Sequence, residues 1–257
     1  MSRVALVRRP SPRLTEGLVT HIDREPVDVA LAERQWHHYV DALHAHGWRT
    51  VEVAPAPDHP DSVFVEDTVV VHRDLAVVTR PGAEERRGET AGTEAALRTL
   101  GFDIARIEAP GTLDGGDVLQ VGDTIYVGRG GRTNPAGIAQ LEQLLAPRGA
   151  TVVTVAVTAA LHLKSTVTAL PDRTIIGWEP AIDDVAVYPR FLAMPEESGA
   201  HVVLLGDDHV LMAAGCPRSE IYFRSMGLVP VVVDISEFVK LEGCVTCLSV
   251  RLRHAPG

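Results

Sequence analysis

Residues 92–109 read GTEAALRTLGFDIARIEA, and the expected fold rests on the pattern that this stretch contains. Ala96, Leu97 and Leu100 fall at helical spacing, a glycine follows where a helix C-cap favours one, and the chain then turns to residues typical of a strand. The same order recurs, less clearly in its last two copies, in residues 29–54, 137–157, 187–206 and 219–234. The sequence therefore predicts a helix and then a strand in each of five stretches.

Two strands joined by a tight turn are predicted ahead of several of these helices, in residues 63–80, 117–128 and 166–178. The resulting unit, strand, strand, helix, strand, repeats at a period of about fifty residues, which is typical of arrays and propellers because one unit cannot bury its own apolar face. We expect an α/β ring of five such units, with a generic α/β sandwich as the alternative. No segment resembles a linker, so residues 1–257 are expected to form a single domain.

Composition and charge narrow the class of protein. The net charge of -10 argues against nucleic acid or an anionic membrane surface as a partner and weakly favours a cationic ligand. No stretch approaches the roughly 20 apolar residues that a membrane span requires. Three cysteines are too few for a disulfide framework in 257 residues, and the N-terminus does not resemble a signal peptide. These features predict reduced thiols and a cytoplasmic protein.

If the five units are arranged radially, the ends of their inner strands converge on a central channel. Residues of chemical interest recur near those ends: Asp61, Glu66, Asp67, Asp114, Asp117, His162 and the pair Cys244 and Cys247. A thiol beside a histidine suits nucleophilic catalysis, because the thiolate is the reactive form. Several carboxylates would raise the pKa of that thiol unless a cation binds among them. A guanidinium, which is planar and always charged, satisfies this requirement.

Less specific interpretations exist for each of these residues. A free cysteine is usually a small buried side chain, and this is the interpretation for Cys216. The CVTC pattern could be half a zinc site or a redox dithiol, but a structural zinc needs four ligands and the sequence has no second pair. The segment is predicted to be a strand, which disfavours a thioredoxin motif and would point Cys244 and Cys247 to opposite faces. No metal site is expected.

Six motifs that span nearly the whole chain carry a family resemblance: PDSVFVEDT (60–68), TRPGAEERR (79–87), TLDGGDVL (112–119), GRGGRTN (128–134), LHLKS (161–165) and EGCVTCLSV (242–250). In this order they resemble the dimethylarginine dimethylaminohydrolases of the guanidine-modifying pentein superfamily. The resemblance implies a five-bladed ββαβ propeller with pseudo-fivefold symmetry. It also implies hydrolysis of Nω-methylated L-arginines (asymmetric dimethylarginine, monomethylarginine) to citrulline and dimethylamine or methylamine, through a covalent cysteine thiouronium intermediate. It implies a small-molecule substrate and no cofactor or metal, and a homodimer is compatible with it.

The resemblance also assigns roles to residues. Cys247 matches the nucleophile, His162 the general acid and base, and Asp67 and Asp114 the carboxylates that hold the guanidinium and orient the catalytic groups. The remaining matches concern substrate binding: Asp61 and Glu66 in the same pocket, Arg86 and Arg132 on the α-carboxylate, the carbonyls of Leu18 and Leu241 on the α-ammonium, and Phe64 and Ser165 in the wall beside His162. Residues 16–28 match a lid.

Several alternatives stay open. Arginine deiminase shares the chemistry but carries a Gly-Gly-rich approach to its cysteine, and agmatine lacks the carboxylate that two arginines would suit. An amidinotransferase would pass the same adduct to an amine. A non-enzymatic propeller that binds a partner, or a zinc-holding thiol protein, are alternatives from other classes. One departure is visible, because relatives often have Asp-Gly where this chain has Glu242-Gly243, which leaves the contact of that side chain open.

Overall fold

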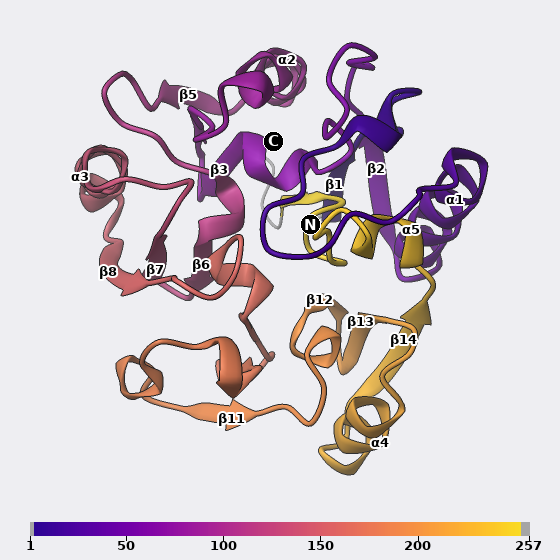
Figure 1. Ribbon diagram of the computed structural model, residues 1–257. Coiled ribbons are helices and arrows are strands. Elements are labelled where there is room, and N and C mark those ends of the chain that lie inside the picture. The colour runs from indigo at the N-terminus through magenta and orange to yellow at the C-terminus, as the bar shows by residue number, and fades with distance from the viewer. Residues whose placement is uncertain (1–2, 253–257) are drawn as a thin grey trace.

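Five three-stranded sheets make up the computed structural model, which describes residues 3–252. In each sheet the middle strand is antiparallel to one neighbour and parallel to the other. The sheets, each written with its middle strand second, are β15(Val250–Leu252)-β1(Arg3–Val7)-β2(Trp48–Glu52), β3(Val69–His72)-β4(Leu75–Val78)-β5(Asp103–Arg106), β6(Val118–Val121)-β7(Thr124–Arg129)-β8(Thr151–Ala156), β9(Val167–Ala169)-β10(Ile175–Gly177)-β11(Phe191–Ala193) and β12(Val202–Gly206)-β13(His209–Ala213)-β14(Val229–Val233). Figure 1 shows them around a common axis. The predicted α/β propeller is confirmed.

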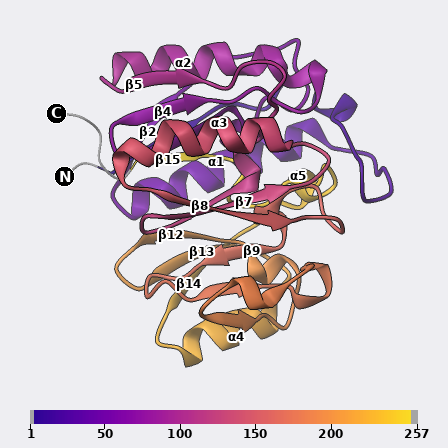
Figure 2. The same cartoon turned by 90° about the vertical axis from the view of Figure 1, so that its left-hand side faces the viewer.

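The longer helices lie on the outer rim of this ring, and Figure 2 shows α2 and α4 at its opposite ends. They are α1 (Val29–Ala45), α2 (Thr90–Thr99), α3 (Pro135–Leu145) and α4 (Pro217–Ser225), while the short α5 (Ser236–Val239) lies nearer the axis. In α1 the side chain of Asp28 accepts a hydrogen bond from the N–H of Leu31, which satisfies one of the free donors of the first turn. Gly47, with a φ of 77°, then reverses the chain into β2 as predicted.

One expected helix is absent from the described residues. The stretch 187–199, interpreted as a weak copy of the helical pattern, instead contains the strand β11 and a short 3₁₀ turn at Ser198–Ala200. Pro189 and Pro195 explain the difference, because each removes a backbone donor and disfavours helical geometry in the residue before it. The fourth sheet therefore has only 3₁₀ turns where the others have an α-helix.

The ring closes on itself through the two ends of the described chain. Strand β15 pairs antiparallel with β1, so that Val4 lies opposite Leu252 and Leu6 opposite Val250. Apolar side chains, mostly Val, Leu, Ile and Ala, fill the spaces between neighbouring sheets and rim helices. Within the part of the chain that is described, no helix is both long and apolar enough to cross a membrane.

Candidate active site

Short 3₁₀ turns precede the first strands of successive sheets, and the predicted site residues lie on them. Asp67 lies within the turn Val65–Thr68 ahead of β3, Asp114 comes directly before the turn Gly115–Asp117 ahead of β6, and His162 directly before the turn Leu163–Ser165 ahead of β9. Each turn contacts the next. Because equivalent positions of a propeller face the axis, residues separated by about fifty positions meet there.

His162 and Asp114 form a buried pair. The Nε2 of His162 lies 3.0 Å from the Oδ2 of Asp114, and neither residue is more than 3% exposed. Asp114 is itself fixed by the N–H of Gly82, which donates to its Oδ1 at 2.8 Å. With Nε2 engaged, Nδ1 is the ring nitrogen left for proton transfer, and it lies 3.8 Å from the Oδ1 of Asp67.

The charge of the surrounding carboxylates decides the protonation of His162. Burial by itself lowers the pKa of an imidazole, but Asp67, the hydrogen bond to Asp114 and the charge of Asp117 outweigh it and raise the pKa of His162 to about 9. Burial raises the pKa of Asp67, yet the charges of His162 and Arg86 reverse this and lower it to about 2. Near neutral pH the site therefore holds an imidazolium beside a carboxylate.

Arg86 is enclosed by acceptors. Its Nη1 donates to the Oδ2 of Asp67 at 2.7 Å, its Nη2 donates to the Oε2 of Glu89 at 2.8 Å, and its Nε also donates to Glu89. The carbonyl oxygens of Asp61 and Phe64 accept further bonds at 3.3 Å. Most of the five N–H donors of this guanidinium are thus committed inside the protein.

Gly116 permits the close approach of Asp67 and His162. Its N–H donates to the Oδ1 of Asp67 at 2.8 Å, and a Cβ at this position would lie 2.6 Å from both that oxygen and the Nδ1 of His162. The glycine pair in TLDGGDVL therefore does more than form a turn, because a side chain at Gly116 would occupy the space between the two groups.

Cys244 and Cys247 lie on a turn rather than on a strand. The N–H of Cys247 donates to the carbonyl of Cys244 at 3.1 Å, and β15 begins only at Val250. The expectation that the two side chains point to opposite faces is therefore wrong, since the alternation of a strand does not apply within a turn. Their sulfurs are 3.2 Å apart, and the N–H of Cys244 lies 3.4 Å from the Sγ of Cys247.

Neighbouring segments fix this turn. The hydroxyl of Tyr39, on α1, donates to the carbonyl of Val245 at 2.9 Å, and the N–H of Glu66 donates to the carbonyl of Cys247 at 3.2 Å. Arg251 donates to the carbonyl of Thr246 at 3.1 Å. The turn is therefore bound to α1, to the turn that holds Asp67 and to β15.

Nine of the twelve predicted residues line one small cavity, and Asp114 reaches it through His162. The lining residues that were predicted are Leu18, Asp61, Phe64, Asp67, Arg86, Arg132, His162, Leu241 and Cys247, and Leu161, Glu242 and Gly243 complete it. The cavity measures about 20 Å³, enough for roughly one water molecule. A larger ligand would have to displace part of the wall.

Leu18 brings the segment of residues 17–28 against this cavity. The carboxylate of Asp61 accepts bonds from the N–H of Leu18 at 3.1 and 3.2 Å, and burial raises the pKa of Asp61 despite the nearby charge of Arg86. The carboxylate of Glu242 accepts from the N–H groups of Thr20 at 2.6 Å and His21 at 2.8 Å. The contact of Glu242 that could not be assigned from the sequence is therefore with the backbone of this exposed segment.

Arg132 has a donor available for a ligand. Its Nη2 lies 3.3 Å from the hydroxyl of Thr20, whereas its Nη1 is buried without any hydrogen-bond partner among the described residues. A buried and unpaired guanidinium nitrogen costs free energy unless an anion completes it. Arg132 therefore has a donor available for a ligand, whereas most donors of Arg86 are occupied, although the family resemblance assigned both arginines to the α-carboxylate.

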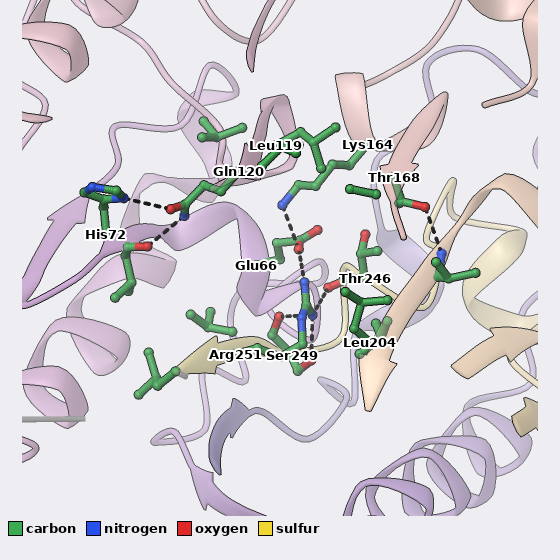
Figure 3. Close-up of a pocket in the computed structure, with 18 of the residues that line it drawn as sticks. Glu66, His72, Leu119, Gln120, Lys164, Thr168, Leu204, Thr246, Ser249 and Arg251 are labelled. Carbon is green, nitrogen blue, oxygen red and sulfur yellow. Dashed lines mark hydrogen bonds and ion pairs between the residues drawn. The ribbon is translucent and has the colours of Figure 1, made fainter. Parts of the chain in front are cut away.

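Glu66 and Ser165 do not line the small cavity. The 3₁₀ turn directs Glu66 to the other side of the ring, where its Oε1 pairs with Lys164 at 2.7 Å and Arg251 at 2.9 Å, as Figure 3 shows. These residues line a separate pocket of about 960 Å³. The N–H of Ser165 donates to the carbonyl of His162 at 3.1 Å, so Ser165 contacts His162 through the backbone. The expected place of Glu66 in the substrate pocket is thus corrected.

The thiol pair shares its ionisation. The hydrogen bond with Cys247 lowers the pKa of Cys244 to about 5, and the same contact, together with burial, raises the pKa of Cys247 well above its usual range. Glu66 and Asp67 contribute to that rise. A cation bound among these carboxylates would reverse their effect and favour negative charge on Cys247.

Asp67, Asp114 and His162 also place one ligand atom each within 4.8 Å of the others, close enough to hold a divalent cation. Such an ion would have to take Asp114 away from His162 and compete with Arg86 for Asp67. A planar cation that donates hydrogen bonds to Asp67 would leave both existing contacts in place.

Three further residues support the site, and none of them was given a role from the sequence, although Asp117 was noted among the acids near the strand ends. Asp117 accepts from the N–H of Leu163 at 2.9 Å and from the hydroxyl of Thr133 at 2.6 Å, which fixes the backbone beside His162. Glu89 neutralises Arg86, and Tyr39 fixes the cysteine turn. For Asp117 a signal existed, because an acid that begins an apolar strand requires a partner. Glu89 and Tyr39 lie in helical patterns that give no such signal.

Comparison with known proteins identifies the family. No protein-family model matches the chain. The N(G),N(G)-dimethylarginine dimethylaminohydrolase of Streptomyces coelicolor is 64% identical, over 98% of each chain, and that of Pseudomonas aeruginosa is 35% identical over 98% of this chain and 100% of its own. A cysteine-to-serine variant of the Pseudomonas aeruginosa enzyme, complexed with citrulline, superposes with a TM-score of 0.92 at 33% identity and covers 98% of this chain and 100% of its own. The N-terminal domain of the arginine dihydrolase ArgZ, at 19% identity, shares the fold with a TM-score of 0.84 and covers 97% of both chains. The chain belongs to the dimethylarginine dimethylaminohydrolase family.

Proposed function

We propose that the protein hydrolyses Nω-methylated L-arginines to citrulline and a methylated amine, with Cys247 as the nucleophile. The observation that carries this proposal is the cavity in which a thiol, an imidazole oriented by Asp114 and the carboxylate of Asp67 meet. A thiol among carboxylates becomes reactive when a cation binds beside it, and a guanidinium is both the cation and the electrophile.

In the first half of the reaction, the guanidinium donates hydrogen bonds to Asp67 and the thiolate of Cys247 attacks its central carbon, forming a C–S bond. His162 is an imidazolium near neutral pH, because its pKa is raised to about 9. It passes its Nδ1 proton to the methylated nitrogen, the C–N bond breaks and dimethylamine or methylamine leaves. The product is a thiouronium attached to Cys247.

In the second half, His162 is neutral and can act as a base. It takes one proton from water as the water oxygen attacks the thiouronium carbon. The C–S bond then breaks, the remaining hydroxyl proton passes to solvent, and citrulline and the Cys247 thiolate result. The hydrogen bond between Nε2 and Asp114 persists through both steps and keeps Nδ1 directed at the reacting groups. No step requires a cofactor.

Arg132 binds the α-carboxylate end of the substrate in this proposal. Its unpaired Nη1 supports binding of the α-carboxylate, whereas Arg86 has its donors committed to Asp67 and Glu89 and holds the guanidinium-binding carboxylate in place. Leu18 and Leu241 line the cavity, and in this proposal their carbonyls accept from the α-ammonium. Because ligand pockets usually exceed about 300 Å³, residues 17–28 must open for the substrate to enter.

The direct test is to incubate the purified protein with arginine, monomethylarginine and asymmetric dimethylarginine and to identify the released amine. Citrulline with dimethylamine and methylamine is expected from the two methylated substrates, and little ammonia from arginine. Predominant release of ammonia from arginine would instead indicate an arginine deiminase. The absence of citrulline from all three would refute hydrolysis.

A single catalytic domain over residues 1–257, a cytoplasmic location and a homodimer stay predictions. Light scattering of the purified protein would measure its mass in solution and test the homodimer.

A further inference from the structure

The two sulfurs of the cysteine turn are arranged for more than nucleophilic attack. The Sγ atoms of Cys244 and Cys247 lie 3.2 Å apart, and both side chains are buried. A disulfide requires a separation of about 2.05 Å, so the sulfurs have only about 1.2 Å to close. The turn has already brought the two sulfurs into contact, which for two distant cysteines would require movement of the backbone.

The two thiols differ in access. Cys247 lines the active-site cavity, whereas Cys244 does not line it and is covered by Thr246, whose hydroxyl lies 3.1 Å from its Sγ. A small oxidant that enters the cavity therefore meets Cys247 first. Cys244 is in the position of a resolving thiol, which attacks the oxidised sulfur before solvent or a second oxidant can do so.

The ionisation of the pair suits such an attack. One sulfur holds a negative charge near neutral pH, because the pKa of Cys244 is lowered to about 5 by its contact with Cys247. Thiolates, not thiols, react with oxidants and with oxidised sulfur. The proton that remains can pass across the contact between the sulfurs, so either of them can carry the charge.

We propose that Cys247 and Cys244 form a reversible oxidation site, in which peroxide converts the catalytic thiol to an intramolecular disulfide and stops turnover. The Cys247 thiolate attacks hydrogen peroxide, an S–O bond forms, the O–O bond breaks, and hydroxide leaves and is protonated to water. The Cys244 thiolate then attacks the sulfenic sulfur, the S–S bond forms, the S–O bond breaks, and a second water is released. Both sulfurs are oxidised and the peroxide is reduced.

The consequence is protection as well as inhibition. Without a resolving thiol, continued oxidation takes a sulfenic acid to sulfinic and sulfonic acids, which do not return to the thiol with simple reductants. A disulfide can be reduced by exchange with a dithiol. Cys244 would therefore turn an irreversible loss of the nucleophile into a reversible one.

The test treats the full-length protein with excess hydrogen peroxide and then counts free thiols after denaturation. The wild type should lose two of its three free thiols, have a mass lower by two hydrogen atoms and yield a peptide linked between Cys244 and Cys247. Dithiothreitol should restore the thiols and nearly all of the activity. Retention of all three thiols, or oxygen addition at Cys247 without the linkage, would overturn the proposal.

Two variants complete the test. Cys244→Ser, compared with its own untreated activity, should gain oxygen atoms at Cys247 and recover little activity with dithiothreitol. Cys216→Ser, which alters a buried cysteine of a different core cluster, should behave as the wild type. Equal recovery of Cys244→Ser and wild type would refute the role of Cys244. Should Cys244→Ser fail to fold, the linked peptide of the wild type still decides the question. The thiol count needs no turnover, so its failure would leave the proposed function untouched.

Discussion

Arg132 and Arg86 should respond differently to removal, although both match the same pair in the family. Arg132→Ala deletes the buried Nη1, which has no hydrogen-bond partner among the described residues, so the loss of free energy should appear chiefly when a carboxylate binds. A hydrogen bond to a charged group contributes about 1.5–3 kcal/mol. At tenfold per about 1.4 kcal/mol, KM for a methylated arginine should rise about 10- to 100-fold with kcat little changed.

Arg86→Ala removes the partner of two buried carboxylates, Asp67 and Glu89, both no more than 2% exposed. Loss of one member of a buried ion pair costs about 3–5 kcal/mol. In a chain of this size Tm falls by about 2–4 °C per kcal/mol, so a decrease of about 6–20 °C is expected. Since Asp67 also loses its support, kcat should fall as well.

Steady-state kinetics and thermal unfolding would be measured on both variants and on Arg98→Ala, a control that removes a largely exposed arginine of α2. A methylated guanidine without the α-carboxylate sharpens the comparison, because Arg132→Ala should turn it over as the wild type does. A loss of kcat without a change of KM in Arg132→Ala, or an unchanged Tm in Arg86→Ala, would refute this division of roles.

Four further predictions concern the same site. Cys247→Ser should abolish citrulline formation with Tm within a few degrees of wild type, and residual turnover near the wild-type rate would exclude it as nucleophile. Gly116→Ala should lower kcat on the order of 100-fold, because its methyl group would lie 2.6 Å from His162 Nδ1; an unchanged kcat would contradict the close approach. Glu242→Gln removes the charge that strengthens the hydrogen bonds from the N–H groups of residues 20 and 21. KM should therefore rise a few-fold, and limited proteolysis within residues 17–28 should become faster. An unchanged rate of cleavage would contradict this role of Glu242. The pKa of His162 is about 9 in the folded protein and 6.5 ordinarily, so its contribution to stability is complete below pH 6.5 and is lost as the pH rises through 9. The Tm of the wild type should therefore fall across that range. The Tm of His162→Gly should fall less.

The repeat of the fold was readable because the helical copies, apart from 187–199, end at a glycine and turn into a β-branched strand. Local signals of this kind survive in the sequence since they are set by backbone conformation and by one buried face. The failure at 187–199 has the same origin, because two prolines outweighed the apolar spacing that suggested a helix. In residues 187–199 the two prolines therefore explain why the fourth unit lacks the expected α-helix.

The site could be predicted in its members but not in its geometry. A resemblance names Asp67, Asp114, His162 and Cys247, and the ring explains why they meet. The direction of each side chain depends on the 3₁₀ turns, which have no periodic signature; hence Glu66 was assigned to the substrate pocket and the two cysteines to opposite faces. Arg86 and Arg132 differ in their free donors because Glu89 binds the guanidinium of Arg86, and this contact could not be read from the sequence.

The position of Cys247 a few residues before β15 couples chemistry to completion of the fold. The β15 strand joins the ring through three paired positions on β1, and among the described strands no other pairing spans as much of the sequence. Contacts between such distant segments form late, because the chain between them must first be ordered. We therefore expect the nucleophile to be fully positioned once the pairing between the first and last strands has formed, and fraying of β15 to loosen the turn that carries the sulfur. Chains in which β15 is not paired with β1 should then turn over little substrate, so catalytic activity would report whether the ring is closed.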